Sequence, residues 1–247
     1  MTGAPAPRVS PGRTPQRGLM RAWTVSVSSG ELVGFCFPAL VGGLLREETP
    51  QLVMGAMVLA GAAEGSVLGW SQARVLRYRL TGLNERRWVT ATAFAAAAAW
   101  FVGMLPSTFY GTWSAWPAWV VALAFTAGGA FVLLVIGVAQ WIELRRHVPH
   151  AARWIAITAA GWGAGLLVLT AVTTPLWQQG QGTLLVAAIG VLGGGLMAVT
   201  MAAVTGVGLR RLLADTRPAD IVAGRHRSDG AGSAAVSVSL VGGSTNR

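Results

Sequence analysis

Two glutamates lie inside long apolar runs of this sequence. Glu31 follows Trp23 and Glu64 precedes Arg74, so at ~1.5 Å per residue both lie roughly 12–15 Å from the same end of their runs. A charged acid near the middle of a bilayer costs about 2.5–3.5 kcal/mol, so each acid faces a protein interior, is protonated or pairs with a partner. The pair is therefore a candidate proton or cation site. The alternative is two neutral acids hydrogen-bonded to backbone carbonyls or serine hydroxyls.

A second group of polar residues has the spacing of metal ligands on a helix. Glu143, His147 and His150 fall at i, i+4 and i+7. Pro149 interrupts that helix, and the arginines beside Glu143 repel a cation, so we expect no metal and interpret the segment as a polar loop near acidic headgroups. The sequence has no phosphate-binding glycine loop and no Ser-His-acid or Cys-His set. It therefore predicts neither an enzyme nor a cofactor.

Two glutamines occupy matching places in a repeated stretch. "GWSQARVLRYRL" begins at Gly69 and "GVAQWIELRRHV" begins at Gly137, and the two share Gly, Gln, Leu and Arg at the same positions. Gln72 and Gln140 therefore end equivalent helices. Each amide either bonds a neighbouring helix, a contact of about 0.6–2 kcal/mol, or lines a ligand site.

The composition identifies the medium around these residues. A mean hydropathy of +0.55, 53% apolar residues and 11% charged residues do not suit a soluble domain. The net charge of +10 is compatible with nucleic-acid binding, but the arginines stand in short groups between apolar runs instead of along one face. We therefore expect a lipid bilayer as the partner and no nucleic acid.

The apolar runs predict an all-α integral membrane protein with six transmembrane helices, because runs of about 20 residues cross a bilayer and must be helical there. A basic disordered arm is expected over 1–21, the six-helix domain over 22–212 and a disordered tail over 213–247. The approximate spans are 22–44, 51–76, 88–105, 117–144, 154–174 and 183–212.

Charge predicts the orientation. Arg46 is the one arginine on one side of the predicted membrane. All others lie toward the other side: before the first span, near or in the second and fourth connections, or from the end of the last span onward. Positively charged loops stay inside, so the expected location is the cell membrane with both termini cytoplasmic. Four tryptophans at the arginine side are expected to anchor at the lipid interface: Trp23, Trp88, Trp141 and Trp154.

The repeated stretch extends to a whole unit of the chain. Trp23, Trp88 and Trp154 recur at nearly even spacing in "RAW", "RRW" and "ARW", and "AAVTGVGLRR" is a third copy with Thr205 in place of glutamine. The pattern predicts three hairpins of two helices each, all running the same way. Because the three copies run in the same direction, they predict a pseudo-threefold axis along the membrane normal.

The chain resembles bacterial multi-pass membrane proteins of actinobacterial type that carry "GxxQWxxLRR" two-helix repeats. The resemblance rests on the glutamine, tryptophan and arginine positions above and covers residues 60–165. It implies the helical hairpins and carries no assigned activity.

Three functions fit these observations. The first is moving or sensing a small solute or ion, with Glu31 and Glu64 as gate residues. An alternative is a non-catalytic scaffold or accessory subunit that binds a membrane-protein partner or a second copy of the chain. The third is a lipid-acting enzyme whose basic loops hold anionic headgroups at the cytoplasmic face.

Overall fold

The computed structural model describes residues 16–45, 47–80 and 82–214, and this part of the chain is helical without strands. Six of its helices are long and apolar enough to cross a membrane, so the protein is a multi-pass helical membrane protein as predicted. The helices are α1 Gln16–Leu44, α2 Pro50–Leu76, α3 Glu85–Thr108, α4 Tyr110–Trp113, α5 Ala118–Leu144, α6 Arg153–Leu176 and α7 Thr183–Ala214.

The predicted spans and the helices differ at their ends. α1 begins at Gln16, inside the predicted arm, and α7 continues to Ala214. The short helix α4, which the sequence did not suggest, follows α3 in the connection to α5. Residues 1–15 and 215–247, which hold most of the predicted arm and tail, lie outside the described residues, as does Arg46.

Local chemistry starts two of the helices. Pro50 occupies the first turn of α2, where its missing N–H is not needed. Asn84 caps α3, and its side-chain oxygen accepts a hydrogen bond from the Arg87 amide at 3.0 Å. Within the membrane, an apolar composition is sufficient to make a segment helical, because a backbone in lipid must satisfy its own hydrogen bonds.

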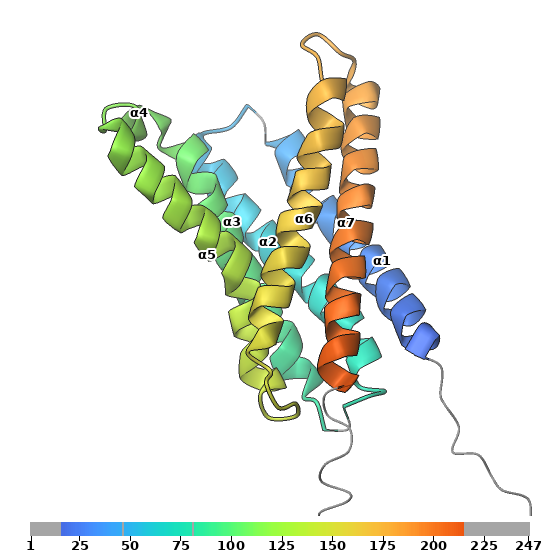
Figure 1. Cartoon of the computed structure of the whole chain (residues 1–247). Helices are drawn as coiled ribbons and strands as arrows, with labels where there is room; N and C mark the ends of the chain where they lie inside the picture. Colours follow the sequence, from blue (N-terminus) through green and yellow to red (C-terminus); the bar gives the residue numbers. More distant parts are fainter. Residues whose placement is uncertain (1–15, 46, 81, 215–247) are drawn as a thin grey trace, which may run out of the picture.

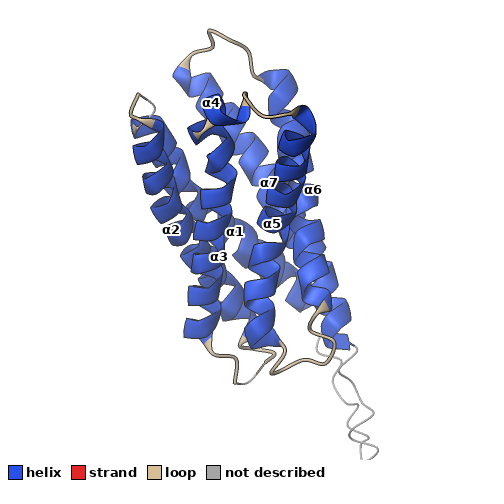
Figure 2. Cartoon of the chain, turned by 90° about the vertical axis from the view of Figure 1, so that its left-hand side faces the viewer, coloured by secondary structure: helices blue, strands red, loops and turns tan. Residues whose placement is uncertain are grey.

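The six long helices form a ring (Figures 1 and 2). Extensive contacts join α1 to α2, α2 to α3, α3 to α5, α5 to α6 and α6 to α7, and α7 returns to pack on α1. The ring is not uniform along its length. At the end that carries α4, α5 leans away from α6 and α7 (Figure 1). At the opposite end the helices converge on the hydrophobic core, which includes Trp23, Leu76, Trp88, Leu144, Trp154 and Leu209.

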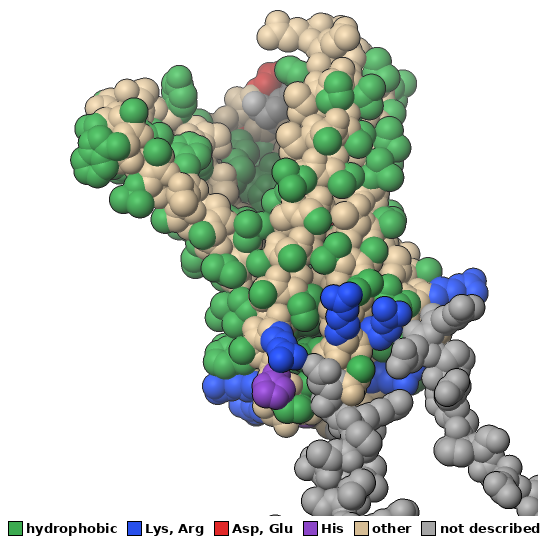
Figure 3. Space-filling model, in the orientation of Figure 1, with side chains coloured by type: hydrophobic (Ala, Val, Ile, Leu, Met, Phe, Trp, Pro, Cys, Tyr) green, Lys and Arg blue, Asp and Glu red, His purple; other side chains and the backbone are tan. Residues whose placement is uncertain are grey.

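The arginines gather at the converging end of the bundle. α1 begins and α7 ends there, so both described chain ends lie on one side (Figure 1). The described arginines all fall at helix ends or in loops on that side, and Figure 3 shows them below a surface dominated by apolar side chains. We call this side the arginine end and the other side the α4 end.

A close approach of two helices depends on Gly65. A Cβ atom built there would lie 2.6 Å from the Ala96 Cβ, 2.8 Å from the Thr92 carbonyl oxygen and 3.0 Å from the Ala93 Cα. Two of these atoms belong to the backbone of α3, so they cannot move aside without shifting that helix. Small residues at such contacts let membrane helices pack closely.

Gly65→Ala is therefore expected to lower the free energy of unfolding in detergent by about 1–3 kcal/mol, the usual cost of overpacking. Gly55→Ala is the matched control, because Gly55 lies on the same helix and a Cβ there meets nothing within 4 Å. The control should unfold at the wild-type temperature or slightly above it. Equal thermal midpoints for the two variants would contradict the close α2–α3 contact.

Candidate functional site

A layer of tryptophans closes the ring toward the arginine end. Trp23, Trp88 and Trp154 are at most 1% exposed and come from α1, α3 and α6. The ring of Trp154 meets Trp23 edge to face at 5.9 Å between centroids and lies 6.4 Å from Trp88. Such aromatic pairs contribute roughly 0.5–1.5 kcal/mol beyond their burial.

Each of these indoles donates its N–H to a residue that the sequence repeat aligns. Trp88 donates to the Gln72 Oε1 at 3.2 Å, and Trp154 donates to the Gln140 Oε1 at 2.8 Å. Trp23 donates to the Thr205 hydroxyl at 3.1 Å, which joins α1 to α7. The three pairs therefore fall at α2–α3, α5–α6 and α7–α1.

Gln140 connects this layer across the ring. Its amide nitrogen donates to the Gln72 Oε1 at 2.7 Å and to the Thr92 hydroxyl at 3.0 Å, while its oxygen accepts from Trp154. The Gln140 side chain is completely buried. These bonds favour the packing interpretation of the two glutamines. We call the three tryptophans with Gln72, Thr92, Gln140 and Thr205 the indole layer.

The interface-anchor prediction needs correction for three of the four tryptophans. Trp23, Trp88 and Trp154 face the bundle interior and reach neither water nor lipid, because their N–H groups find acceptors inside the protein. Trp141 differs from them. It is partly exposed, and the Arg145 guanidinium carbon lies 5.0 Å above its ring, as suits a side chain at the membrane boundary.

A cavity of about 400 Å³ lies inside the ring. All six long helices line it, and the lining is apolar apart from the carboxyl group of Glu64 and the indole N–H groups of Trp100 and Trp162. We call it the central cavity; its walls include Phe35, Leu68, Met104, Ile136, Leu169 and Met197.

Glu64 is held in place by two neighbours. The Trp100 indole nitrogen donates to the Glu64 Oε2 at 2.6 Å. On the other side α1 comes close because Gly34 has no side chain: a Cβ there would lie 3.1–3.2 Å from backbone and side-chain atoms of Glu64. These two contacts orient the Glu64 carboxyl group at the cavity wall.

Glu31 lies beside Glu64 on the neighbouring helix. Its side chain is 1% exposed, and within the described residues the Glu64 carboxyl group is the one polar partner in reach of its carboxyl oxygens. The Glu31 and Glu64 carboxyl groups are close enough to repel each other when both are charged. The structure thus brings the two acids together, and their role stays a prediction.

A second cleft of about 680 Å³ opens between α3, α5 and α6 toward the α4 end. It shares four lining residues with the central cavity, namely Gly103, Val132, Leu133 and Leu166. Figure 3 shows a hollow in this region, where α5 diverges from α6. We call this second cleft the outer cleft; through the four shared residues it adjoins the cavity that Glu64 lines.

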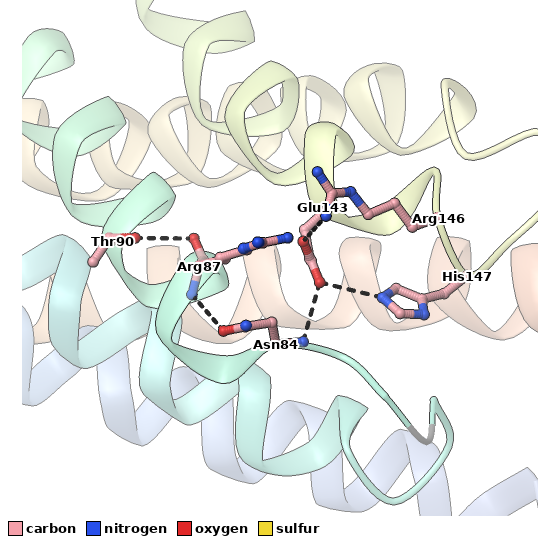
Figure 4. A network of polar contacts seen from close by, with 6 residues as sticks. All are labelled: Asn84, Arg87, Thr90, Glu143, Arg146 and His147. Carbon is pink, nitrogen blue, oxygen red and sulfur yellow. Dashed lines mark hydrogen bonds and ion pairs between the residues drawn. The ribbon is translucent and has the colours of Figure 1, made fainter.

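Glu143 organises a polar network at the arginine end (Figure 4). Its Oε1 accepts the Asn84 backbone N–H at 3.1 Å and lies 3.2 Å from the His147 Nε2. Its Oε2 lies 3.9 Å from the Arg146 guanidinium. The network ties the α2–α3 loop to the end of α5.

The three predicted metal candidates do not meet. Glu143 and His147 pair with each other, but His150 is exposed and adopts a left-handed backbone conformation with φ of +56° beyond Pro149. Across the described ranges no three His, Cys, Asp or Glu side chains lie together as metal ligands would.

Comparison with protein-family models, curated proteins and solved structures finds no match to this chain. Fold and site together define a class: a multi-pass helical membrane protein with one buried acid, Glu64, in the wall of its interior cavity. The resemblance to bacterial repeat proteins stays a prediction.

Gln140→Leu tests the indole layer. The substitution keeps the volume but removes the acceptor of Trp154 and the donor to Gln72, so it should lower the free energy of unfolding by about 1–3 kcal/mol. The control is Thr126→Val on the same helix, where an exposed hydroxyl bonds only the Ala122 carbonyl. Thermal unfolding in detergent measures both, and a Gln140→Leu protein as stable as the control would exclude a stabilising role for the layer.

Proposed function

We propose that the protein binds a small, largely apolar cation in its central cavity and moves or senses it, with Glu64 as the binding group. The observation that carries the proposal is the buried Glu64 carboxyl group in an otherwise apolar cavity. A carboxylate in such surroundings needs a counter-charge or a proton. No arginine is available at its depth among the described residues, because the described arginines lie at the arginine end.

The shape and chemistry of the cavity support this class of solute. A volume of about 400 Å³ suits a small organic molecule. Trp100 and Trp162 contribute aromatic surface, which attracts cations through the negative face of the ring. A hydrated metal ion would find too few oxygen ligands in these walls, whereas an organic cation with apolar groups matches them.

Glu31 supplies the second half of the proposed mechanism. It lies next to Glu64, whose carboxyl group is its one polar partner within the described helices. A cation that neutralises Glu64 removes the repulsion between the two acids, so cation binding and proton binding compete at the pair. Exchange of a proton for a cation at this pair is the coupling that we propose.

The threefold repeat is part of this proposal. Gly69 approaches Val89 and Thr92 at the start of the second predicted copy. Gly137 approaches Ile155 and Thr158, which hold the same two positions in the third copy. The three indole pairs support the same relation. Glu31 and Glu64 do not recur in the other copies, so the binding site would be a specialisation of one part of a regular frame.

Glu64→Gln is expected to lower the affinity for tetraphenylphosphonium, an apolar cation, roughly tenfold or more, because about 1.4 kcal/mol of charge interaction equals a factor of ten. Equilibrium dialysis of the detergent-purified protein measures the affinity. Glu31→Gln should keep cation binding and weaken its dependence on pH, because Glu64 alone then exchanges a proton for the cation. Glu48→Gln, at an exposed position of the α1–α2 connection, is the control.

A neutral compound of the same shape, tetraphenylmethane, separates charge recognition from apolar partitioning. It should bind wild type and Glu64→Gln alike. Unchanged tetraphenylphosphonium affinity in Glu64→Gln, or equal losses in Glu48→Gln, would refute the proposed site.

We also propose that the arginine end is cytoplasmic, in the cell membrane, on the basis of the arginine distribution. In a Cys36→Ser background, an impermeant maleimide should label Ser114→Cys near α4 in intact cells. It should label Tyr78→Cys, at the arginine end, only after the membrane is permeabilised. Both positions are exposed, so access decides the result, and the reverse pattern would overturn the orientation.

A further inference from the structure

A groove of about 480 Å³ runs between α3 and α5 on the outside of the ring. Small side chains form its floor, among them Ala91, Ala98 and Ala139. Exposed side chains, Phe94 at 77% and Ile142 at 47%, rise beside them. The groove faces away from the central cavity and toward the surrounding lipid.

Two arginines lie at one end of this groove. Arg87 belongs to the first turn of α3, and Arg146 is the second residue after the end of α5. Figure 4 shows the Arg87 side chain extending from α3 toward Glu143 and Arg146. Arg87 forms no ion pair within the described residues, and Arg146 meets Glu143 only at 3.9 Å while its side chain stays half exposed.

The groove changes from charged to apolar along its length. From Arg87 to Ala98 it climbs α3 by roughly 16 Å at ~1.5 Å per residue. Apart from Thr90 near the arginines, this part of the lining carries only apolar side chains. A ligand that fits must therefore be anionic at one end and apolar over a length comparable to half a hydrocarbon layer.

From this gradient of charge we propose that the groove binds one anionic glycerophospholipid of the leaflet at the arginine end. Its phosphate lies between Arg87 and Arg146, and an acyl chain lies along the alanines of α3 and α5. The site is separate from the central cavity and does not depend on the function proposed for it.

Glu143 does not prevent this binding. Its carboxylate is 5% exposed and is already engaged by the Asn84 amide and His147. Two guanidinium groups outnumber it at the groove, so the end that a headgroup meets is positive overall. Glu143 instead links the α2–α3 loop to the end of α5, which keeps both arginines beside the groove.

The test is lipid retention by native mass spectrometry of the full chain in mild detergent, titrated with phosphatidylglycerol. The double variant Arg87→Gln/Arg146→Gln should weaken binding of the first phosphatidylglycerol roughly tenfold or more, because each cationic side chain near a headgroup contributes to lipid affinity. The matched control is Arg86→Gln/Arg145→Gln. It removes the same charge from the adjacent residues, which do not line the groove, and should bind as wild type does.

Two further arms identify what is bound. Ala98→Leu keeps both arginines but fills the apolar part, and it should weaken binding of phosphatidylglycerol without changing the elution volume of the purified protein. Glycerol phosphate, which lacks acyl chains, should not displace the lipid. Equal losses in the two double variants, no loss in either, or displacement by glycerol phosphate would overturn the proposal.

Discussion

The indole layer is the interaction on which the rest of the structure depends. Six helices in lipid gain little from apolar contact with one another, because lipid tails are as apolar as their side chains. Three buried N–H groups and two buried amides, however, must find partners, since an unsatisfied polar group in this medium costs several kcal/mol. Gln140 satisfies groups from three helices at once and so holds α2, α3 and α6 around α5.

The layer also explains why the two ends of the bundle differ. Toward the arginine end, large aromatic rings and the amide contacts fill the middle of the ring. Toward the α4 end, the cleft between α5 and α6 is lined mostly by glycine and aliphatic side chains, with Trp113 and Phe125 among them, and the helices separate. The central cavity therefore begins where the indole layer stops, and Glu31 and Glu64 lie in this transition.

Much of the architecture was predictable from the sequence, because length and apolarity suffice to identify membrane helices. The repeated stretch around Gln72 and Gln140 identified two residues that bond across the bundle. It did not show which residues they bond to. The interface prediction is wrong for Trp23, Trp88 and Trp154, because an indole suits a membrane interface and a buried hydrogen bond equally well. Trp100, which holds Glu64, follows a run of alanines, and nothing in its spacing relates it to a residue on another helix.

The divergence of α5 from α6 has a thermodynamic consequence for any solute that reaches Glu64 through the outer cleft. Mostly apolar side chains of α3, α5 and α6 line that opening, so under the proposed function a solute partitions into the bilayer before it meets the protein. Occupancy of the pocket then follows the amount of compound per lipid, and a weak intrinsic affinity suffices for molecules that concentrate in membranes. Selectivity would rest first on the partition of a solute between water and the bilayer, and only afterwards on its binding to the Glu64 carboxyl group.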